Sequence, residues 1–368
     1  MESASTGEIG GRNCSRSLGH LTLTRVSLKT PTLILVGNPN EIHIGAHLLA
    51  GADELGYPVR RFNSEEAFAG NRLVARMNWW MRGRRPNCLR EFSDRIVQVC
   101  QAQRPEVVVS TGISPIDEAA LRQVGEMGVK RCNYLTDDPW NPTHRAPWFL
   151  RALQQYDHIF SPRRSIMGDL HAHGCRTISY LPFAYAPELH FSDPPFTPDE
   201  VARYSSDVVF AGGADSDRVA ILGSLIRQGF QVALYGGYWE RHSITKRYAL
   251  GHADPSTLRK AIAGAKVALC LVRRANRDGH SMRTFEVAAM GACMLAEYTK
   301  EHEEILGPDG EAAVYFRSES EMVDRLRWLL DNEKERQRLR AAVQIRITGG
   351  RNTYKDRLET MLAIGAET

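Results

Sequence analysis

The stretch between residues 267 and 296 constrains the fold of this chain more than any other part of the sequence. It opens with an apolar run, Val267–Val272, and it ends, after a polar loop and a run of small residues, with a second apolar run, Cys293–Ala296. Short apolar runs bounded by polar residues are typical of buried strands, and Gly291 supplies a tight turn before the second one. The order predicts strand, loop, helix, turn and strand, so the loop lies at the carboxyl edge of a parallel sheet, where open α/β folds bind ligands.

The same alternation of apolar strand and helix runs through most of the chain. Predicted strands of a first series span 32–37, 58–62, 106–112, 131–136, 158–161 and 177–181. Those of a second series span 206–213, 231–237, 267–272, 293–296 and 312–316. Helical segments separate the strands in each series, which predicts two parallel sheets with helices on both faces. The expected fold class is therefore α/β, with two Rossmann-like β/α/β domains.

A proline-rich break separates the two series. The prolines in this segment are Pro182, Pro187, Pro194, Pro195 and Pro198. Clustered proline interrupts helices and strands and is typical of a linker. We therefore expect a flexible leader at 1–30, a first domain at 31–185, a linker at 186–204, a second domain at 205–345 and a terminal helix at 346–368.

Composition and charge limit the class of protein. The 368 residues are 43% hydrophobic and 24% charged, as in a globular protein with a large core, and the net charge of +4 is too small to indicate nucleic-acid binding. No run of about 20 apolar residues predicts a membrane span, and the first 30 residues lack the apolar core of a secretory signal. Seven cysteines without a CxxC pair favour a reducing compartment, so we expect a cytoplasmic protein.

The loop and helix that follow Val272 carry the groups that a nucleotide site needs. A carboxylate in the first turns of a helix, as expected for Glu286, can accept two hydrogen bonds from a ribose diol. Helix N–H groups and Arg side chains can hold a diphosphate. Arg273, His280 and Arg283 lie in the same stretch, where they face either the diphosphate and sugar or the solvent. A solvated helix carboxylate is the alternative interpretation of Glu286.

This stretch resembles the donor-binding segment of GT-B glycosyltransferases, in which two acids separated by seven residues flank the nucleotide sugar. Glu286 matches the second acid, which contacts the ribose, and Asp278 stands in the place of the first, one methylene shorter. We therefore place Asp278 with the catalytic residues. The run His280–Glu286 and its continuation through residue 333 resemble most closely the CgeB-type branch, the spore-maturation-protein-like glycosyltransferases of group 1. The resemblance is specific over residues 205–345.

The resemblance implies a GT-B fold, with two Rossmann-like domains facing a central cleft and a terminal helix that returns to the first domain. It also implies that Gly212 and Gly213 approach the donor diphosphate and that Arg218 holds it. Residues 251–254 resemble the loop whose backbone lies against the nucleobase. A second glycine pair, Gly236–Gly237, is interpreted as a strand-end turn only.

The first domain is expected to present the acceptor. His43 follows the first strand, where inverting GT-B enzymes often place a catalytic base, and an imidazole suits proton removal from a hydroxyl. A surface residue at a helix start is the alternative. Asp137 and Asp138 end a buried strand, so they either bind the acceptor and act as base, or serve as turn and cap residues. No ligand-spaced His or carboxylate accompanies them, and we predict no required metal or other cofactor.

Residues 78–85 combine two Trp with three Arg. Such a segment can dock on anionic lipid headgroups or on an extended acceptor. The same pattern describes a helix with buried Trp and solvated Arg side chains, and we favour that interpretation. Peripheral contact with the inner face of a membrane stays an alternative.

Together these features predict a metal-independent glycosyltransferase of carbohydrate biosynthesis, with a hexosyltransferase expected. It would move a sugar from a nucleotide-diphosphate sugar to the hydroxyl of a glycan, lipid-linked, protein or small-molecule acceptor. One alternative is a non-catalytic nucleotide-sugar-binding or partner subunit on the same scaffold. Another is an enzyme like the nucleotide-sugar 2-epimerases. A working base at His43 or an Asp would imply inversion, and its absence would favour retention.

Overall fold

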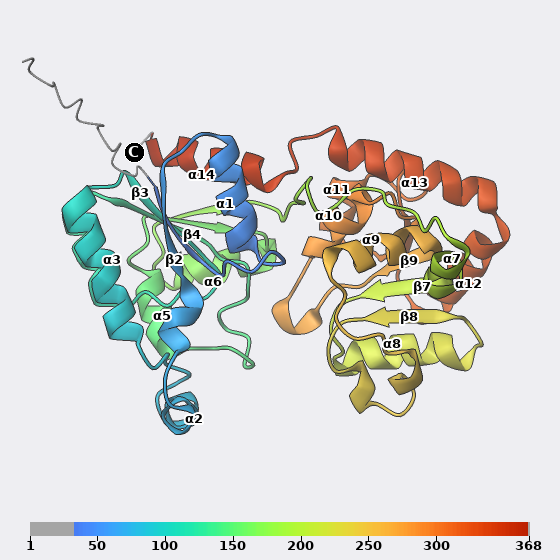
Figure 1. Cartoon of the computed structure of the whole chain (residues 1–368), viewed down its shortest axis with the longest axis horizontal. Helices are drawn as coiled ribbons and strands as arrows, with labels where there is room; N and C mark the ends of the chain where they lie inside the picture. Colours follow the sequence, from blue (N-terminus) through green and yellow to red (C-terminus); the bar gives the residue numbers. More distant parts are fainter. Residues whose placement is uncertain (1–32, 367–368) are drawn as a thin grey trace, which may run out of the picture.

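Two parallel sheets build two α/β domains that lie side by side (Figure 1). The computed structural model describes residues 33–366, and the leader expected at 1–30 lies outside these residues. The α/β architecture and the alternation of strands and helices predicted from the sequence are confirmed.

The first sheet has the strand order β2-β1-β3-β4-β5-β6, and its neighbouring strands are parallel. Its strands are β1 (Leu33–Gly37), β2 (Val59–Asn63), β3 (Val107–Thr111), β4 (Lys130–Tyr134), β5 (His158–Ser161) and β6 (Thr177–Tyr180). Along β1, Leu33 and Leu35 pack into one hydrophobic cluster, while Ile34 and Val36 pack into another. Successive side chains of a strand point to opposite faces, so a strand covered on both sides has an unbroken apolar run.

Helices cover the two faces of this sheet. They are α1 (Ile44–Glu54), η1 (Ser64–Phe68), α2 (Arg72–Met81), α3 (Leu89–Gln103), α4 (Glu118–Glu126), α5 (Pro147–Leu153), η2 (Arg164–Ile166) and α6 (Met167–Ala172). The side chains of Asn71 and Asp117 cap α2 and α4 by accepting hydrogen bonds from backbone N–H groups in the first turn. Unlike the other helices, α2 projects away from the body of the domain (Figure 1).

The second sheet has the order β11-β10-β9-β7-β8, again with parallel neighbours. Its strands are β7 (Ser206–Ala211), β8 (Val232–Tyr235), β9 (Ala265–Cys270), β10 (Met294–Glu297) and β11 (Val314–Phe316). The accompanying helices are α7 (Pro198–Tyr204), α8 (Ser216–Arg227), η3 (Trp239–Arg241), η4 (Lys246–Tyr248), α9 (Pro255–Gly264), η5 (Arg274–Asn276), α10 (Met282–Ala289), α11 (Lys300–Leu306), α12 (Glu319–Asp331) and α13 (Glu333–Thr348).

Both sheets contain a position where the strand order reverses, and doubly wound sheets bind ligands at such a position. In the first sheet β1 lies between β2 and β3, and in the second β7 lies between β8 and β9. Connections that leave such a strand and its neighbour run to opposite sides, which opens a crevice at the carboxyl ends. Loops after β1 and β3 and loops after β7 and β9 line one common pocket, so the two crevices face each other.

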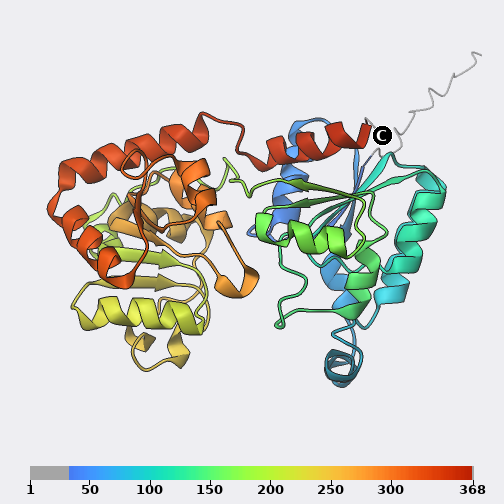
Figure 2. The same cartoon turned by 180° about the vertical axis from the view of Figure 1, so that it is seen from behind.

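The two domains are connected by the segment before α7 and by the segment between α13 and α14 (Tyr354–Ala366). The two segments meet where Tyr185 forms a parallel bridge with Thr353. Helix α14 then packs against α1 of the first domain, as Figure 2 shows from behind. The guanidinium of Arg357 on α14 donates to the carbonyl groups of Pro182 and Phe183, which fixes the helix to the first connection.

The contact between α1 and α14 predicts a stability effect at Gly51. A Cβ added at Gly51 would lie 2.9 Å from the Cα of Lys355, so Gly51→Ala must push the two helices apart. We expect a loss of about 1–3 kcal/mol in the free energy of unfolding. Gly168→Ala on α6 is the matched control, because no heavy atom lies within 4 Å of its added Cβ. Urea unfolding of both variants checks this, and equal stabilities would contradict it.

Candidate active site

A cavity of about 410 Å³ lies between the two domains, where their carboxyl edges meet; we call it the central pocket. A second cavity of about 760 Å³, the side pocket, extends from it over the second domain. The two cavities share Ile42, Ala211, Gly212, Gly213 and Arg283, so they are neighbouring parts of one cleft. Their combined lining comes from loops that follow strands in both sheets.

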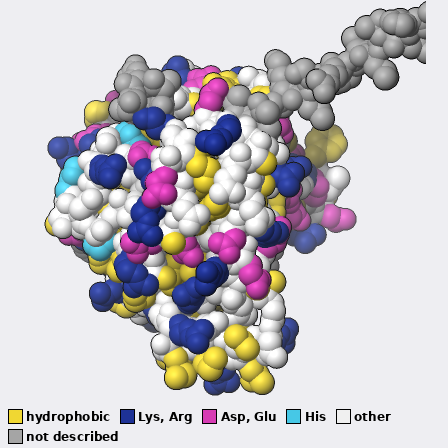
Figure 3. Space-filling view, turned by 90° about the vertical axis from the view of Figure 1, so that its left-hand side faces the viewer, with side chains coloured by type: hydrophobic (Ala, Val, Ile, Leu, Met, Phe, Trp, Pro, Cys, Tyr) yellow, Lys and Arg dark blue, Asp and Glu magenta, His cyan; other side chains and the backbone are white. Residues whose placement is uncertain are grey.

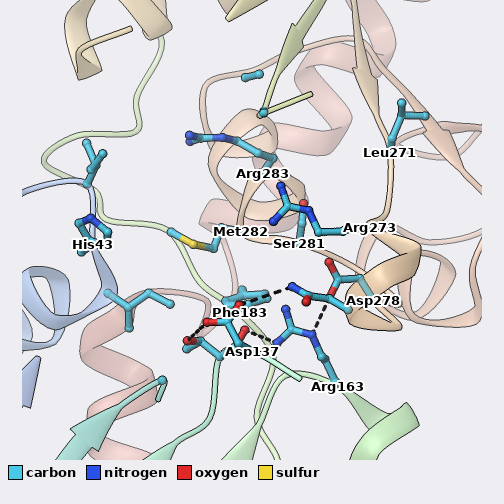
Figure 4. Close-up of a pocket in the computed structure, with 18 of the residues that line it drawn as sticks. His43, Asp137, Arg163, Phe183, Leu271, Arg273, Asp278, Ser281, Met282 and Arg283 are labelled. Atoms are coloured by element: carbon cyan, nitrogen blue, oxygen red, sulfur yellow. Dashed lines mark hydrogen bonds and ion pairs between the residues drawn. The ribbon is translucent and has the colours of Figure 1, made fainter. Parts of the chain in front are cut away.

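Guanidinium groups of the second domain make the central pocket attractive to anions. Arg218 is buried and donates to the carbonyl of Gly213 at 3.1 Å, which holds the glycine turn after β7. Burial lowers the pKa of Arg218, and the neighbouring Arg273 lowers it further. Arg273 and Arg283 are partly exposed and reach into the same space (Figure 4). The three residues predicted from the sequence to hold a diphosphate therefore lie together.

The N-terminus of α10 opens on this pocket. Ser281, Met282 and Arg283 line the cavity, and the hydroxyl of Thr284 accepts a hydrogen bond from the backbone N–H of Ser281 at 3.2 Å. The carboxylate of Asp215 caps α8, where it accepts from the N–H of Arg218. Ser281 and Thr284 likewise form a capping box at α10, so both helix starts are capped, and both border the cavity with their partial positive charge.

The second glycine pair is more than a strand-end turn, which corrects the interpretation from the sequence. A Cβ at Gly236 would lie 2.3 Å from the carbonyl oxygen of Gly212, so the loops after β7 and β8 approach closely only because Gly236 has no side chain. The N–H of Gly236 also donates to the carbonyl of Gly251 at 2.8 Å. Both glycine pairs and residues 251–253 line the side pocket.

Glu286 lies in the side pocket with its charge held in place. Only 1% of the residue is exposed, and its carboxylate contacts the guanidinium of Arg283 one turn earlier on α10. Burial by itself raises the pKa of Glu286, but the charge of Arg283 and the neighbouring His190 and His47 outweigh it, so the pKa lies below the ordinary value. The side chain is therefore an ionised hydrogen-bond acceptor on the wall of the cavity.

Two buried imidazoles border Glu286. The Nδ1 atom of His190 accepts from the N–H of Ala186 at 3.0 Å, which leaves its Nε2 atom facing Glu286 at 3.8 Å. His47 stacks on Tyr354 with ring centroids 4.9 Å apart. Within residues 33–366 the Nε2 atom of His47 has no hydrogen-bond partner. Burial lowers the pKa of His47 to about 4, so this ring is neutral at physiological pH.

Asp278 lines the central pocket, but an arginine of the other domain holds its carboxylate. The Oδ1 atom accepts from Nε of Arg163 at 2.5 Å, and both side chains are almost fully buried (Figure 4). Burial raises the pKa of Asp278 although Arg163 opposes this. The sequence placed Asp278 with the catalytic groups, whereas its contact here is structural and joins the two domains.

The other predicted residues divide between the cavity and its surroundings. His43 and Asp137 line the central pocket, and Asp137 accepts from Asn276 of the second domain at 3.5 Å. Asp138 lies in neither cavity, because its carboxylate accepts from Arg277 at 2.7 Å and caps the turn at Trp140. The structure therefore places Asp138 outside both cavities, and the role of base expected for it stays a prediction.

His280 also lies behind the pocket wall and does not line either cavity. It is fully buried, its Nδ1 atom lies 2.7 Å from Glu301, and its Nε2 atom accepts from the N–H of Phe183. These bonds attach the loop before α10 to the interdomain connection. In this structure His280 supports the loop and lies outside both cavities, and the donor-binding role expected for it stays a prediction.

Sequence reasoning missed four residues of the site. Arg163 follows β5 and therefore lies at the same sheet edge as the predicted residues, which is a signal that could have found it. Asn276 carries the same signal, since it lies in the loop after β9, whereas His47 and His190 do not. His190 falls in the segment interpreted as a linker, and His47 lies on α1 among apolar residues.

No group of three or more His, Cys, Asp or Glu side chains among residues 33–366 is arranged to hold a metal ion. The expectation that activity needs no metal stays a prediction. Across the same residues, no helix has both the length and the apolar character of a membrane span.

A family model described as glycosyl transferase-like matches residues 218–363, which include β8 to β11 and most of α14. The match contains Arg218, Arg273, Arg283 and Glu286. Among curated proteins, none matches the chain.

Several solved structures share the fold of about nine-tenths of this chain. Sucrose-phosphate synthase from Thermosynechococcus elongatus has 11% sequence identity and a TM-score of 0.61, with 90% of this chain and 98% of that chain covered. HepE of Anabaena in complex with UDP-glucose has 13% identity and a TM-score of 0.60, with 90% and 99% covered. A glycosyltransferase from Rickettsia africae has 11% identity and a TM-score of 0.60, with 91% and 98% covered.

The chain is thus a two-domain α/β protein of the GT-B class, and the prediction of this fold is confirmed. Residues 218–363 are similar to the glycosyl transferase-like family, and they include most of the second domain and of α14.

The buried His47 ring predicts how stability depends on pH. In the unfolded chain an imidazole binds its proton near pH 6.5, but in the folded protein the pKa of His47 is about 4. The contribution of this ring is therefore fully present above about pH 6.5 and is lost as the pH falls towards 4. His47→Phe keeps the stacking on Tyr354 and should reduce the loss of unfolding free energy between pH 6.5 and 5 by about 2 kcal/mol. Urea unfolding across this range checks the slope, and an unchanged slope would contradict the assignment.

The ion pair between Arg163 and Asp278 predicts a second stability effect. Asp278→Asn leaves a buried guanidinium without its counter-charge, and we expect a loss of about 3–5 kcal/mol in the free energy of unfolding. Glu304→Gln is the matched control, since it removes an acid from an exposed interdomain pair with Arg164 and should cost less than about 1 kcal/mol. Urea unfolding distinguishes the two, and similar losses would show that burial does not matter here.

Proposed function

We propose that this protein transfers a sugar from a nucleotide-diphosphate sugar to an acceptor hydroxyl. The observation that carries the proposal is the contact of Glu286 with Arg283 at the carboxyl edge of β7 and β9, with Arg273 lining the adjoining central pocket. An ionised carboxylate can accept hydrogen bonds from both hydroxyls of a ribose. The guanidinium groups of Arg283, one helical turn earlier, and of Arg273, in the preceding loop, can bind the diphosphate. The GT-B fold and the glycosyl transferase-like match support the same chemistry.

The two cavities divide the donor between them in this proposal. The nucleoside occupies the side pocket, with the ribose at Glu286 and the base against the backbone of residues 251–253. The diphosphate lies between Gly213, Arg273 and the start of α10, because Gly213 and Arg283 border both cavities and Arg273 lines the central pocket beside Gly213. The sugar then extends into the central pocket, where the first domain presents His43 and Asp137.

The leaving diphosphate gains negative charge as the glycosidic bond to it breaks. Arg273, Arg283 and the N–H groups at the start of α10 can stabilise this charge, so we propose that transfer does not require a metal. His43 and Asp137 are the groups of the first domain that line the cavity and can take a proton from the acceptor hydroxyl. A hexose donor is proposed on the resemblance to group 1 glycosyltransferases.

The donor site is tested by thermal shift with UDP, GDP, dTDP and CMP and their sugar conjugates, without added metal. A ligand at 100 times its Kd should stabilise the protein by about 2.7 kcal/mol. Glu286→Gln replaces the charged acceptor of the two hydrogen bonds proposed for the ribose hydroxyls by a neutral one. We therefore expect the nucleotide to bind at least about tenfold more weakly. Glu333→Gln, on the exposed first turn of α13, is the matched control and should bind like the wild type.

Product analysis separates transfer from the alternatives. Slow release of nucleoside diphosphate from the bound donor without acceptor supports the transferase. Binding without any turnover would identify a nucleotide-sugar-binding subunit, and a sugar nucleotide inverted at carbon 2, seen by NMR, would identify an epimerase. If no nucleotide shifts the folded wild type, the donor proposal is wrong.

A further inference from the structure

Helix α2 and the loops beside it carry a charge pattern that the proposed function does not use. Between residues 67 and 90 the chain has six Arg and no Asp or Glu; the six are Arg72, Arg76, Arg82, Arg84, Arg85 and Arg90. All but Arg84 are exposed. Protein surfaces usually mix charges of both signs. A segment of this length with positive charges alone is therefore uncommon in a chain whose net charge is only +4.

Large apolar side chains lie among these arginines. Leu73, Trp80 and Met81 are exposed to 77%, 77% and 79%, and Met77 and Trp79 are about half exposed. This corrects the expectation from the sequence, which favoured buried Trp side chains. We call the exposed side chains of Arg72, Leu73, Arg76, Met77, Trp79, Trp80, Met81 and Arg82 the α2 patch. Hydrophobic and basic side chains gather at the lower end of the face in Figure 3, where α2 projects.

The structure holds the α2 patch in place from behind. Asn78 is the buried residue of the helix, and its Nδ2 atom donates to Asn87 at 2.9 Å. Asn87 in turn donates to the carbonyl of Ala69 at 3.2 Å, which joins the two ends of the projecting segment.

Arg84 anchors the same segment to the domain, because it donates to the carbonyl groups of Arg145 and Pro142 at 2.6 and 2.7 Å. At the neighbouring Gly83 an added Cβ would lie 2.6 Å from Pro147 at the start of α5. The exposed apolar side chains are therefore displayed on a supported helix and do not belong to a loose loop.

We propose that the α2 patch docks this protein on an anionic membrane surface. A helix of 10 residues is about 15 Å long, so it cannot cross a bilayer but can lie in the interface plane. In that position Leu73, Trp80 and Met81 enter the boundary between headgroups and acyl chains, where Trp is favoured. The arginines then meet lipid phosphates, which complement a segment, residues 67–90, that has no acidic residue.

The location of α2 fits a role in presenting the acceptor side of the molecule to the membrane. Helix α2 belongs to the first domain and projects on the side opposite α14 (Figure 1). The docking inference does not depend on the donor proposal, because vesicle binding is measured without nucleotide.

The experiment is cosedimentation of the full chain with vesicles of phosphatidylcholine alone and of phosphatidylcholine mixed equally with phosphatidylglycerol. We expect the wild type to bind the anionic vesicles more than tenfold better, and salt to weaken this binding. Arg72→Gln with Arg76→Gln should reduce binding about 25-fold, at about fivefold for each charge removed. Trp80→Ser with Met81→Ser should reduce it at least about tenfold.

Matched controls come from exposed residues far from the patch. Phe196→Ser removes an aromatic side chain that is 92% exposed before α7, and Arg122→Gln removes an exposed charge on α4; both should bind like the wild type. Thermal unfolding should be unchanged in every variant, since each replaced side chain is exposed.

Three results would overturn the proposal. The first is absence of wild-type binding to anionic vesicles, and the second is binding that the patch variants leave unchanged. The third is a dimer in sedimentation velocity that Trp80→Ser with Met81→Ser dissociates, without vesicle binding by the wild type. That result would assign the patch to a second copy of the chain.

Discussion

The site depends on buried charges that join the two domains. Arg163 and Asp278 meet at 2.5 Å with almost no exposure, and Arg277 of the second domain meets Asp138 of the first at 2.7 Å. A buried charge is tolerable only beside its partner, so each pair strongly favours one relative position of the domains. Because Asp278 begins the loop that leads into α10, this position also sets where the helix start faces the opposite sheet. The ion pairs therefore set how the cleft residues of the first domain face those of the second.

Most of the fold could be predicted from the sequence, because fully buried parallel strands need unbroken apolar runs. Val107–Val109 and Val267–Cys270 are such runs, and they lie within β3 and β9. The environment of α2 could not be predicted in this way. Trp80 and Met81 are apolar and yet exposed. An apolar side chain is buried only if a neighbouring element covers it, and the local sequence pattern does not show whether one does.

The candidate site was predictable where one loop carried several of its residues. Arg273, Arg283 and Glu286 lie close together in the sequence, and in the structure they line the two adjoining cavities as expected. Asp138 and His280 were misplaced because position in a loop does not reveal the direction of a side chain. Both point to partners in the other domain or its connection, Arg277 and Phe183. Such contacts span more than 90 positions and exist only once the two sheets face each other.

The bridge between Tyr185 and Thr353 brings the two covalent connections of the domains to one place. Two bodies joined by two connections at one edge can rotate about that edge without a change in either connection. The ion pair of Arg163 with Asp278 lies beside the same edge, because the guanidinium of Arg163 lies 5.5 Å from the ring of Phe183 on the first connection. The pair therefore restrains rotation of the domains next to the place where the chain crosses between them.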